Sequence, residues 1–393
     1  GTSNTTVGKD AGYYNTTGTN NTYIGTAAGP NVTASTGSYN TAVGRSALRA
    51  NTTGFNHVAI GYSALYSSTA SGANVAIGYE SMATFNSTQN ASHFNTAIGT
   101  QSAQSLTTGI QNTFLGGLAG RYSTTTDGNT FVGHKAGQGI DGTKLTGNIN
   151  TVVGYEAGLI MQGACTENTI LGAYAGDNLT TGNANTFLGT YTATDGTVTG
   201  DNNSCVGHAA GAAITTGGNN LFLGHDSGRT GSPGGNQTTG NGSIALGDEN
   251  IGDAYIQVDW TVVSDERDKT DFTALDIGLD FVKAMKPYTF KWDKRSKYGD
   301  KKADDYDLDA VTSDGTHKED WLDLGFKAQD VKALEEASNY KIADKTNLTV
   351  SITEDGKQYG MKYAKLVPIL VKAIQEQNAL IEALTARVTT LEG

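Results

Sequence analysis

The chain has 393 residues, enough for two or three domains, and a formal net charge of −12. Residues 1–250 and 251–393 are both acidic, by about −5 and −7, so neither part carries the basic surface of a nucleic-acid-binding protein. Two cysteines are too few for a disulfide framework or a zinc site, and the longest apolar run, residues 366–371, is far shorter than the ~20 residues that cross a bilayer.

A motif close to Asn-Thr-x-φ-Gly-x-x-Ala-Gly, where φ is aliphatic, recurs fourteen times from the N-terminus to residue 250. Its φ-linked glycines are Gly8, Gly25, Gly44, Gly61, Gly78, Gly99, Gly116, Gly133, Gly154, Gly172, Gly189, Gly207, Gly224 and Gly247. Seven of the thirteen intervals are 17 residues and the others are 18 to 23, which is the period of a short-coil solenoid. We therefore predict an all-β parallel β-solenoid over 1–250, a β-roll shaft with almost no helix. Because the chain opens without methionine, we expect it to be part of a longer protein.

Two columns of the repeat are expected to point inward. The residue before the glycine is Val, Ile or Leu in all fourteen repeats, and the third residue after it is Ala, Ser or Thr in thirteen. The asparagine that opens most repeats fits an internal amide ladder, and each glycine supplies a backbone angle that tight corners need. Because each coil has few large apolar side chains, we expect assembly with neighbouring chains.

The residue after each glycine varies from repeat to repeat, which marks an exposed column. Tyr62 and Tyr79 follow one another in this column and form either a receptor contact, such as a sugar platform, or simple cover for the edge of the core. His208 and His225 also follow one another, but no acidic or cysteine column joins them, so we expect no metal and no cofactor. These repeats resemble those in the heads of trimeric autotransporter adhesins, although their period is longer.

The sequence changes character after residue 250. An alternating apolar run predicts a strand connector over 251–263. Beyond it we expect a helix over 273–285 that ends before Pro287, a strand over 288–292, a long polar loop over 293–320 and a helix over 325–337. A hairpin of 349–352 with 358–362, turning at Asp355-Gly356, precedes the last helix.

The last helix, expected over 364–393, carries heptads. Val367, Ile374, Ile381 and Val388 occupy a positions, and Leu370, Gln377, Leu384 and Leu391 occupy d positions. This pattern predicts a coiled coil. Its β-branched a residues and leucine d residues favour two strands, whereas Ala373 and Leu380 widen the apolar face beyond two.

Ser264 and Lys269 lie five residues apart in the run SDERDK. A serine hydroxyl and a neutral lysine can act as nucleophile and base, but a lysine pKa near 10.4 must first be lowered by burial or a cationic neighbour such as Arg267. On spacing alone, a polar turn after a strand explains the same residues.

Four motifs set this segment in a wider pattern: SDERDK, then LDFVKAMKPYTFKW from Leu279, LGFKAQDV from Leu324 and YGMKYAKLVPILVKAIQEQ from Tyr359. Together they resemble the C-terminal intramolecular chaperone and autoprotease domain of phage endosialidases, tail fibres and tail spikes. The resemblance implies a chaperone domain over 264–363, a trimeric coiled coil over 364–393 and a parallel homotrimer.

The resemblance also implies self-cleavage between Val263 and Ser264, with Ser264 as nucleophile and Lys269 as base. Asp265, Arg267 and Gln329 are then candidates for supporting this pair. The sequence departs from the pattern at Asp323 and Leu324, because many relatives have a histidine just before the glycine found here as Gly325.

Two functions remain open from the sequence. In the first, the chain is the distal part of a phage tail fibre or spike that is assembled in the host cytoplasm, binds a cell-surface glycan or protein receptor, and joins other tail or baseplate proteins. In the second, it is a bacterial cell-surface trimeric adhesin with a permanent C-terminal trimerisation domain. A polysaccharide-cleaving spike would need a pair of carboxylates, and no such pair recurs at equivalent positions of the repeats. The chain is therefore expected to cleave only itself.

Overall fold

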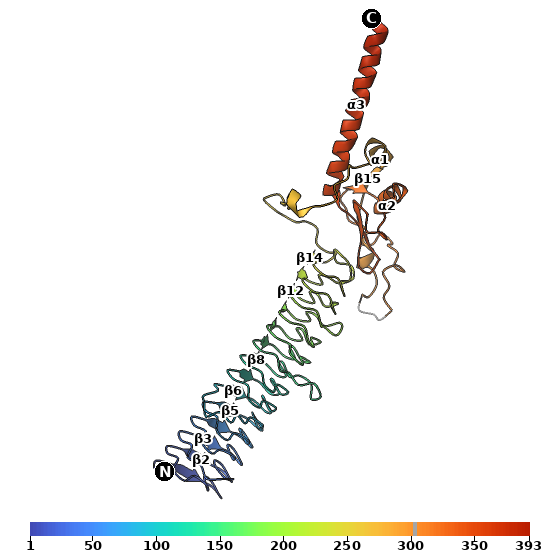
Figure 1. The fold of residues 1–393 in the computed structure, drawn as a ribbon. Helices are drawn as coiled ribbons and strands as arrows, with labels where there is room; N and C mark the ends of the chain where they lie inside the picture. Colours follow the sequence, from blue (N-terminus) through green and yellow to red (C-terminus); the bar gives the residue numbers. More distant parts are fainter. Residues whose placement is uncertain (302–304) are drawn as a thin grey trace. The chain divides into compact units, whose positions relative to one another are not determined.

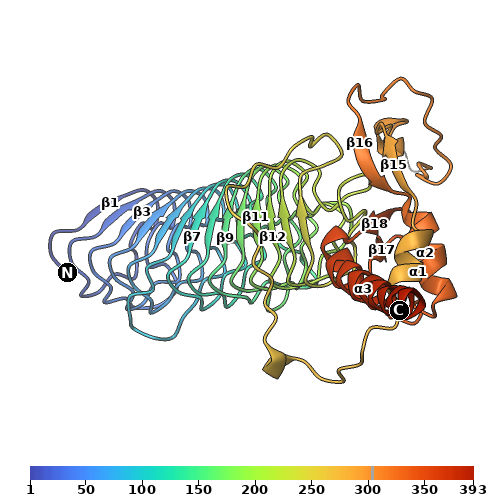
Figure 2. The ribbon, with the colours of Figure 1, turned by 90° about the horizontal axis from the view of Figure 1, so that it is seen from above.

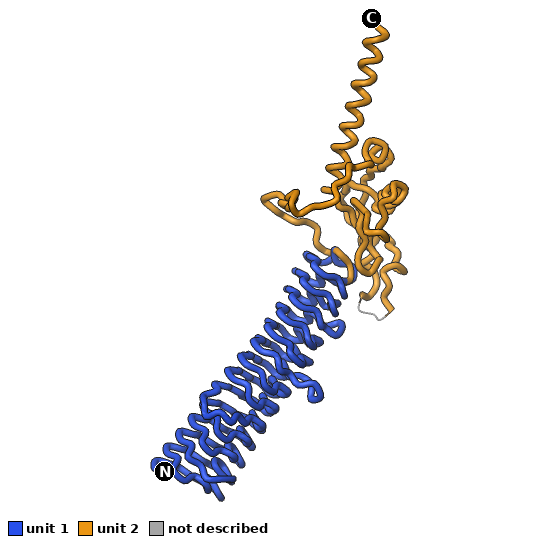
Figure 3. Tube along the Cα trace, viewed as in Figure 1, with its two compact units in different colours: residues 1–233, 237–248 blue, residues 234–236, 249–393 orange. Residues whose placement is uncertain are grey.

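The computed structural model describes residues 1–301 and 305–393. The chain divides into two compact units (Figure 3). Unit 1 comprises residues 1–233 and 237–248, and unit 2 comprises residues 234–236 and 249–393. The division lies beside the composition change near residue 250. Part of the loop expected over 293–320, residues 302–304, lies outside the described residues.

Unit 1 is a parallel β-solenoid with one three-residue strand in each coil (Figures 1 and 2). Its strands are β1 (Thr5–Val7), β2 (Thr22–Ile24), β3 (Thr41–Val43), β4 (Val58–Ile60), β5 (Val75–Ile77), β6 (Thr96–Ile98), β7 (Thr113–Leu115), β8 (Thr130–Val132), β9 (Thr151–Val153), β10 (Thr169–Leu171), β11 (Thr186–Leu188), β12 (Ser204–Val206), β13 (Leu221–Leu223) and β14 (Ile244–Leu246). Each strand pairs in parallel with the next in chain order, so the fourteen form one sheet. The predicted solenoid is confirmed, and unit 1 contains no helix.

The core of unit 1 is filled by the middle residue of each strand. This residue is buried in all thirteen strands from β2 to β14, and it ranges in size from Ala42 to Phe114 and Tyr23. The residue before the glycine, expected inside, points outward instead: Ile60 is 36% exposed, Leu115 is 43% exposed, and none of the fourteen is buried. That expectation was wrong because successive side chains of a strand alternate between faces, so an inward middle residue turns its neighbours outward.

The second expected column is inside. Ala28, Ala64 and Ala119 are among the fully buried small residues three positions after a motif glycine. The glycines themselves form a stack with positive φ. At Gly116 φ is +139°, and a Cβ there would lie 2.3 Å from the carbonyl oxygen of Gly133 in the next coil. The close spacing of the coils thus excludes any side chain from this corner.

Asparagines form the predicted internal ladder. The backbone N–H and side-chain Nδ2 of Asn112 both donate to Oδ1 of Asn95, each at 3.0 Å, and Nδ2 also donates to the carbonyl oxygen of Thr126 at 2.6 Å. Asn129 repeats the backbone contact to Asn112 at 3.0 Å. Each amide therefore satisfies buried polar groups of its own coil and of both neighbouring coils.

One position of this ladder holds a histidine. The backbone N–H of His57 donates to Asn40 Oδ1, its Nε2 lies 2.9 Å from the carbonyl oxygen of Ser71, and its Nδ1 accepts from the N–H of Asn74 at 3.4 Å. The ring is 1% exposed. Burial lowers the pKa of His57 from 6.5 to about 4, so the folded protein holds the ring neutral.

We expect His57 to make the solenoid acid-sensitive. Between pH 6.5 and about 4, His57 is protonated in the unfolded chain but stays neutral in the folded chain. Lowering the pH through this range therefore lowers the free energy of unfolding, by about 2.5 kcal/mol at pH 4.5. His57→Asn restores the usual ladder residue and should remove this loss. Denaturant titrations of both proteins at pH 7 and pH 4.5 measure it. Equal acid losses in the two proteins would contradict the assignment.

Unit 2 is a small α+β domain followed by a long helix. Its elements are η1 (Glu266–Asp268), α1 (Leu279–Ala284), β15 (Pro287–Phe290), η2 (Arg295–Lys297), β16 (Asp323–Phe326), α2 (Ala328–Ala337), β17 (Val350–Ile352), β18 (Tyr359–Met361), η3 (Tyr363–Lys365) and α3 (Leu366–Glu392). β15 pairs antiparallel with β16, and β17 with β18, the latter as the predicted hairpin. A core of Phe281, Val331, Val350, Leu366 and Ile369 joins α1, α2, the hairpin and the start of α3.

Unit 2 differs from the prediction in one helix that starts later and one strand that does not form. The helix expected from residue 273 begins only at Leu279, because Gly278 before it has φ −154° and ψ −118° and so cannot continue a helix. The segment 251–263 forms no strand, which corrects the predicted connector. Apolar alternation makes a strand only where another strand supplies hydrogen bonds, and this segment pairs with none in the described chain.

Helix α3 has one packed end and one bare face. Leu366, Ile369 and Ala373 are buried in the domain core, whereas the heptad residues beyond them are exposed, including Ile374 at 65% and Leu384 at 58%. None of the described helices has the length and apolar character to span a membrane. Both cysteines, Cys165 and Cys205, are free and buried.

Candidate functional site

Ser264 and Lys269 lie together at the start of unit 2. One turn, η1, folds the chain back between them: Asp265 caps the turn by accepting from the backbone N–H of Arg267 at 2.9 Å, and Lys269 closes it through its N–H to the carbonyl oxygen of Glu266 at 3.1 Å. Lys269 Nζ then reaches Ser264 Oγ at 2.5 Å and the carbonyl oxygen of Ser264 at 3.0 Å. The residues thus have the contact that a nucleophile and its base require.

Arg267 and Asp265 form their own pair beside this contact. Arg267 Nη2 lies 2.6 Å from Asp265 Oδ2, and this hydrogen bond lowers the pKa of the Asp265 carboxyl. The carboxylate offsets the guanidinium charge that the sequence suggested as a neighbour for Lys269. In this geometry the pair holds η1 closed and so positions Lys269.

The scissile bond proposed from the sequence is accessible in the single chain. Val263 is 81% exposed, and both Ser264 and Lys269 are exposed. A lysine can act as a base only when its amine is neutral, and burial of the amine favours that form. The local turn alone does not bury Lys269.

The other residues considered from the sequence lie on separate elements. Gln329 is exposed in the first turn of α2. Asp323, at the position next to the family histidine, lies in β16 and accepts a hydrogen bond from Trp292 Nε1 at 3.0 Å. The structure thus gives Asp323 a role in holding the tryptophan beside the β15–β16 pair.

Aromatic side chains stack along the exposed column of unit 1. The rings of Tyr62 and Tyr79 lie 5.3 Å apart with 11° between their planes, and the Arg45 guanidinium lies 5.7 Å from the Tyr62 centroid. A second ladder runs over six coils with neighbouring rings 5.2 to 5.8 Å apart; its members are His134, Tyr155, Tyr174, Tyr191, His208 and His225. The sequence did not predict this ladder because Tyr174 and Tyr191 are the second residue after the motif glycine, whereas the other four rings belong to the first. In the closely parallel pairs, such as Tyr62–Tyr79, each ring covers one face of its neighbour, so the ring edges are the part left for a ligand to contact.

The two histidines at the end of this ladder gain an acidic neighbour. Ligand atoms of His208, His225 and Asp226 lie within 4.8 Å of one another. However, Asp226 is paired with Arg229 at 3.1 Å, and His225 Nδ1 is 3.0 Å from Asp248 Oδ2. Asp226 and His225 thus both have partners within the protein.

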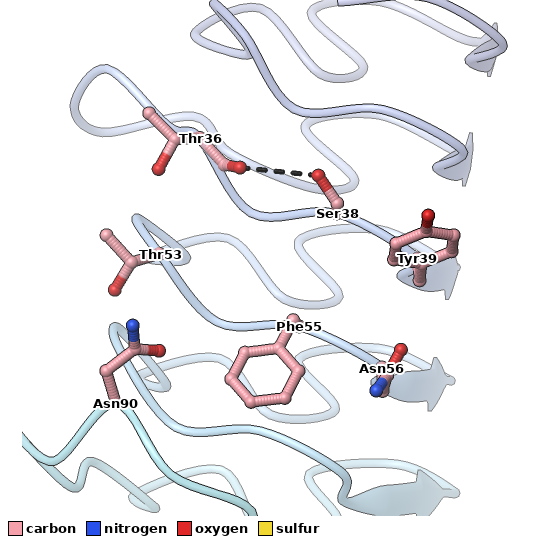
Figure 4. Close-up of a pocket in the computed structure, with 7 residues that line it drawn as sticks. All are labelled: Thr36, Ser38, Tyr39, Thr53, Phe55, Asn56 and Asn90. Carbon is pink, nitrogen blue, oxygen red and sulfur yellow. Dashed lines mark hydrogen bonds between the residues drawn. The ribbon is translucent and has the colours of Figure 1, made fainter.

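One shallow pocket lies between the coils that contain residues 36–56 and the loop at Asn90 (Figure 4). Its lining is hydroxyl, amide and aromatic, without charge: Thr36, Ser38, Tyr39, Thr53, Phe55, Asn56 and Asn90. Such groups hydrogen-bond and stack against uncharged polar ligands.

The comparison with known families concerns the segment that carries Ser264 and Lys269. The family model for the chaperone of endosialidase, which is named as a peptidase family, matches residues 264–339. Residues 264–339 are thus similar to the chaperone of endosialidase. The match begins at Ser264, the first residue of the η1 contact, and it covers the first three of the four sequence motifs, which confirms the resemblance for that segment. No curated protein matches the chain. The chaperone domain, the solenoid before it and the bare α3 face are consistent with a homotrimeric protein similar to tail spikes.

Proposed function

We propose that the chain is the distal part of a phage tail fibre or spike whose chaperone domain assembles three chains and then cuts itself away between Val263 and Ser264. The observation that carries the proposal is the 2.5 Å contact of Lys269 Nζ with Ser264 Oγ at the first residue of the chaperone domain. Host attachment through unit 1 and a place in the virion tail belong to the same proposal.

The cut proceeds by transfer of an acyl group. Ser264 Oγ attacks the carbonyl carbon of Val263 while neutral Lys269 accepts the hydroxyl proton. The bond from that carbon to the Ser264 nitrogen breaks, the bond to Oγ forms, and the proton passes to the freed amine. Water then hydrolyses the ester and leaves a carboxylate on Val263.

Assembly supplies what the single chain lacks. Lys269 is exposed in one chain, so a neutral amine requires water to be excluded by packing between chains. The exposed heptad face of α3 is the surface that brings three chains together. Because the base becomes active only in the assembled trimer, cleavage follows folding and leaves a shaft that is protected by its unfolding barrier.

The test is a denaturing gel of the purified wild-type chain beside Ser264→Ala, Lys269→Ala and a control, Lys283→Ala. Lys283 is an exposed lysine of α1 that pairs with Asp280. We expect wild type and the control to give fragments of 263 and 130 residues, and the other two variants to stay whole. All four should assemble equally on size-exclusion chromatography.

A wild-type chain that stays whole would contradict self-cleavage. If it is also trimeric, the chaperone domain acts as a permanent trimerisation domain, as in the cell-surface adhesin that the sequence left open. Cleavage that persists in Lys269→Ala would remove the lysine from the mechanism. For host attachment, retention of the purified shaft on host cells is the corresponding measurement, with Tyr62→Ala and Tyr79→Ala as variants.

A further inference from the structure

We propose that the outer face of the strand sheet in unit 1 is the surface through which three copies of the solenoid meet. We call the first and third residues of β1 to β14 the strand face. The inference rests on the proposed trimer and specifies which surface closes it.

The third residues of the strands form an apolar row along the whole length of the strand face. The third residue is Val, Ile or Leu in every strand, none of the fourteen is buried, and eight are at least 36% exposed. The first residue is Thr, Ser or an aliphatic residue, and it lies beside its counterpart in the next strand, as Thr113 lies beside Thr130. A single chain thus leaves a continuous row of branched aliphatic side chains in water.

Charge avoids this surface. Residues 1–250 contain nineteen charged residues, and none of them falls among the forty-two residues of the fourteen strands. Residues 1–250 carry a net charge of about −5, so copies of the solenoid repel one another on the whole. The strand face lets them approach without placing like charges together.

The area suits a protein interface. Thirteen steps of about 4.8 Å give a strip about 62 Å long, and a width of about 10 Å with side chains gives a flat area of about 600 Å². That approaches the roughly 800 Å² per partner of a stable interface. Side-chain relief adds to the flat area.

The repeat identifies the occupant as further copies of this chain. The strand face presents the same kind of side chain in every strand of the sheet. A partner with the same strand spacing can make the same contact with every one of these side chains. In a parallel assembly about a three-fold axis, each coil meets the same coil of its neighbours, so Ile98 packs against Ile98 and Leu115 against Leu115. A glycan would lose hydrogen bonds with water against these aliphatic side chains. The pocket at Phe55 and the stacked tyrosines lie outside the strand face and remain available.

The test measures the accessibility of single cysteines in the full chain. Ile98→Cys lies on the strand face, and Thr108→Cys lies in the same coil on an exposed loop. Leu115→Cys and Thr125→Cys form a second pair in the next coil. The native Cys165 and Cys205 are fully buried, so the unchanged chain gives the background. The probe is a maleimide dye, and light scattering gives the mass of each sample.

We expect Ile98→Cys and Leu115→Cys to react at least about tenfold more slowly than their loop partners, because the trimer must open to expose them. A trimer in which both members of each pair react equally would overturn this inference and leave the proposed trimer intact. A monomer with reactive strand-face cysteines would overturn both. The two independent pairs guard against a single variant that fails to fold.

Discussion

A chain that ends at residue 363 is expected to be recovered as aggregate rather than as folded shaft. The deletion removes α3, whose heptad residues are exposed in the single chain and are the proposed contact between the three chains. It also removes Leu366 and Ile369 from the core of the chaperone domain. Without a trimer, the apolar strand face of every folding shaft stays in water, where it favours disordered association.

The measurement is the soluble fraction after expression, followed by the mass and circular dichroism of what remains. A second variant, Ile374→Asp with Ile381→Asp, keeps α3 and its packed end but places charge on the bare face. We expect loss of trimer in both cases. The matched control is Asn378→Ala, which changes an exposed polar residue between the two heptad positions. A soluble, monomeric and folded truncated chain would refute the dependence on α3.

Replacing Gly116 by alanine is expected to destabilise the solenoid by about 3 to 5 kcal/mol, because two costs act together. At φ +139° the backbone lies in a region that residues with a Cβ rarely adopt. The added Cβ would also lie 2.3 Å from the Gly133 carbonyl oxygen and 2.6 Å from its carbon. Neither neighbour is a flexible side chain, so the coils must move apart and their hydrogen bonds lengthen.

Gly117 is a matched control one residue away. A Cβ there meets only His134 Cδ2 at 3.5 Å, an ordinary contact, and its φ is not in the positive region. Gly117→Ala should therefore change the free energy of unfolding by no more than about 0.5 kcal/mol. Denaturant unfolding or thermal melting of the two variants compares them directly. Similar midpoints for both would show that the corner can relax and that the glycine stack is not required.

The repeat period and the heptads predicted the main elements because both reflect backbone geometry. The direction of the side chains was harder. The position of Ile60 and Leu115 is aliphatic in every repeat, which suggested that it lies inside. The residues that fill the core, such as Ala42, Phe114 and Cys205, are also apolar but vary widely in size from coil to coil. Within a single chain, a regular row of aliphatic residues is expected in the core, so a prediction made for one chain places these residues inside.

The candidate site shows the same limit. The spacing of Ser264 and Lys269 predicted that they could be in contact. The sequence did not predict that Arg267 pairs with Asp265, because this pairing depends on the cap of η1. The expected strand over 251–263 failed for a related reason, since a strand needs a partner that this single chain does not provide. A contact that forms only between chains is seen in a single chain as a surface without a partner.

The sameness of the fourteen strands bears on how three chains find their alignment. A face that repeats nearly the same side chains at each step contains no landmark, so chains displaced by one whole coil would still bury most of it. Such slipped assemblies differ little in energy from the aligned one and would be hard to correct once closed, since every contact along the shaft must break to shift it. The alignment must come from a part of the chain that does not repeat. The chaperone domain and α3 do not repeat. In the proposed trimer they would align one coil of each chain, the remaining coils would then pair in register, and the aligning domain would no longer be needed.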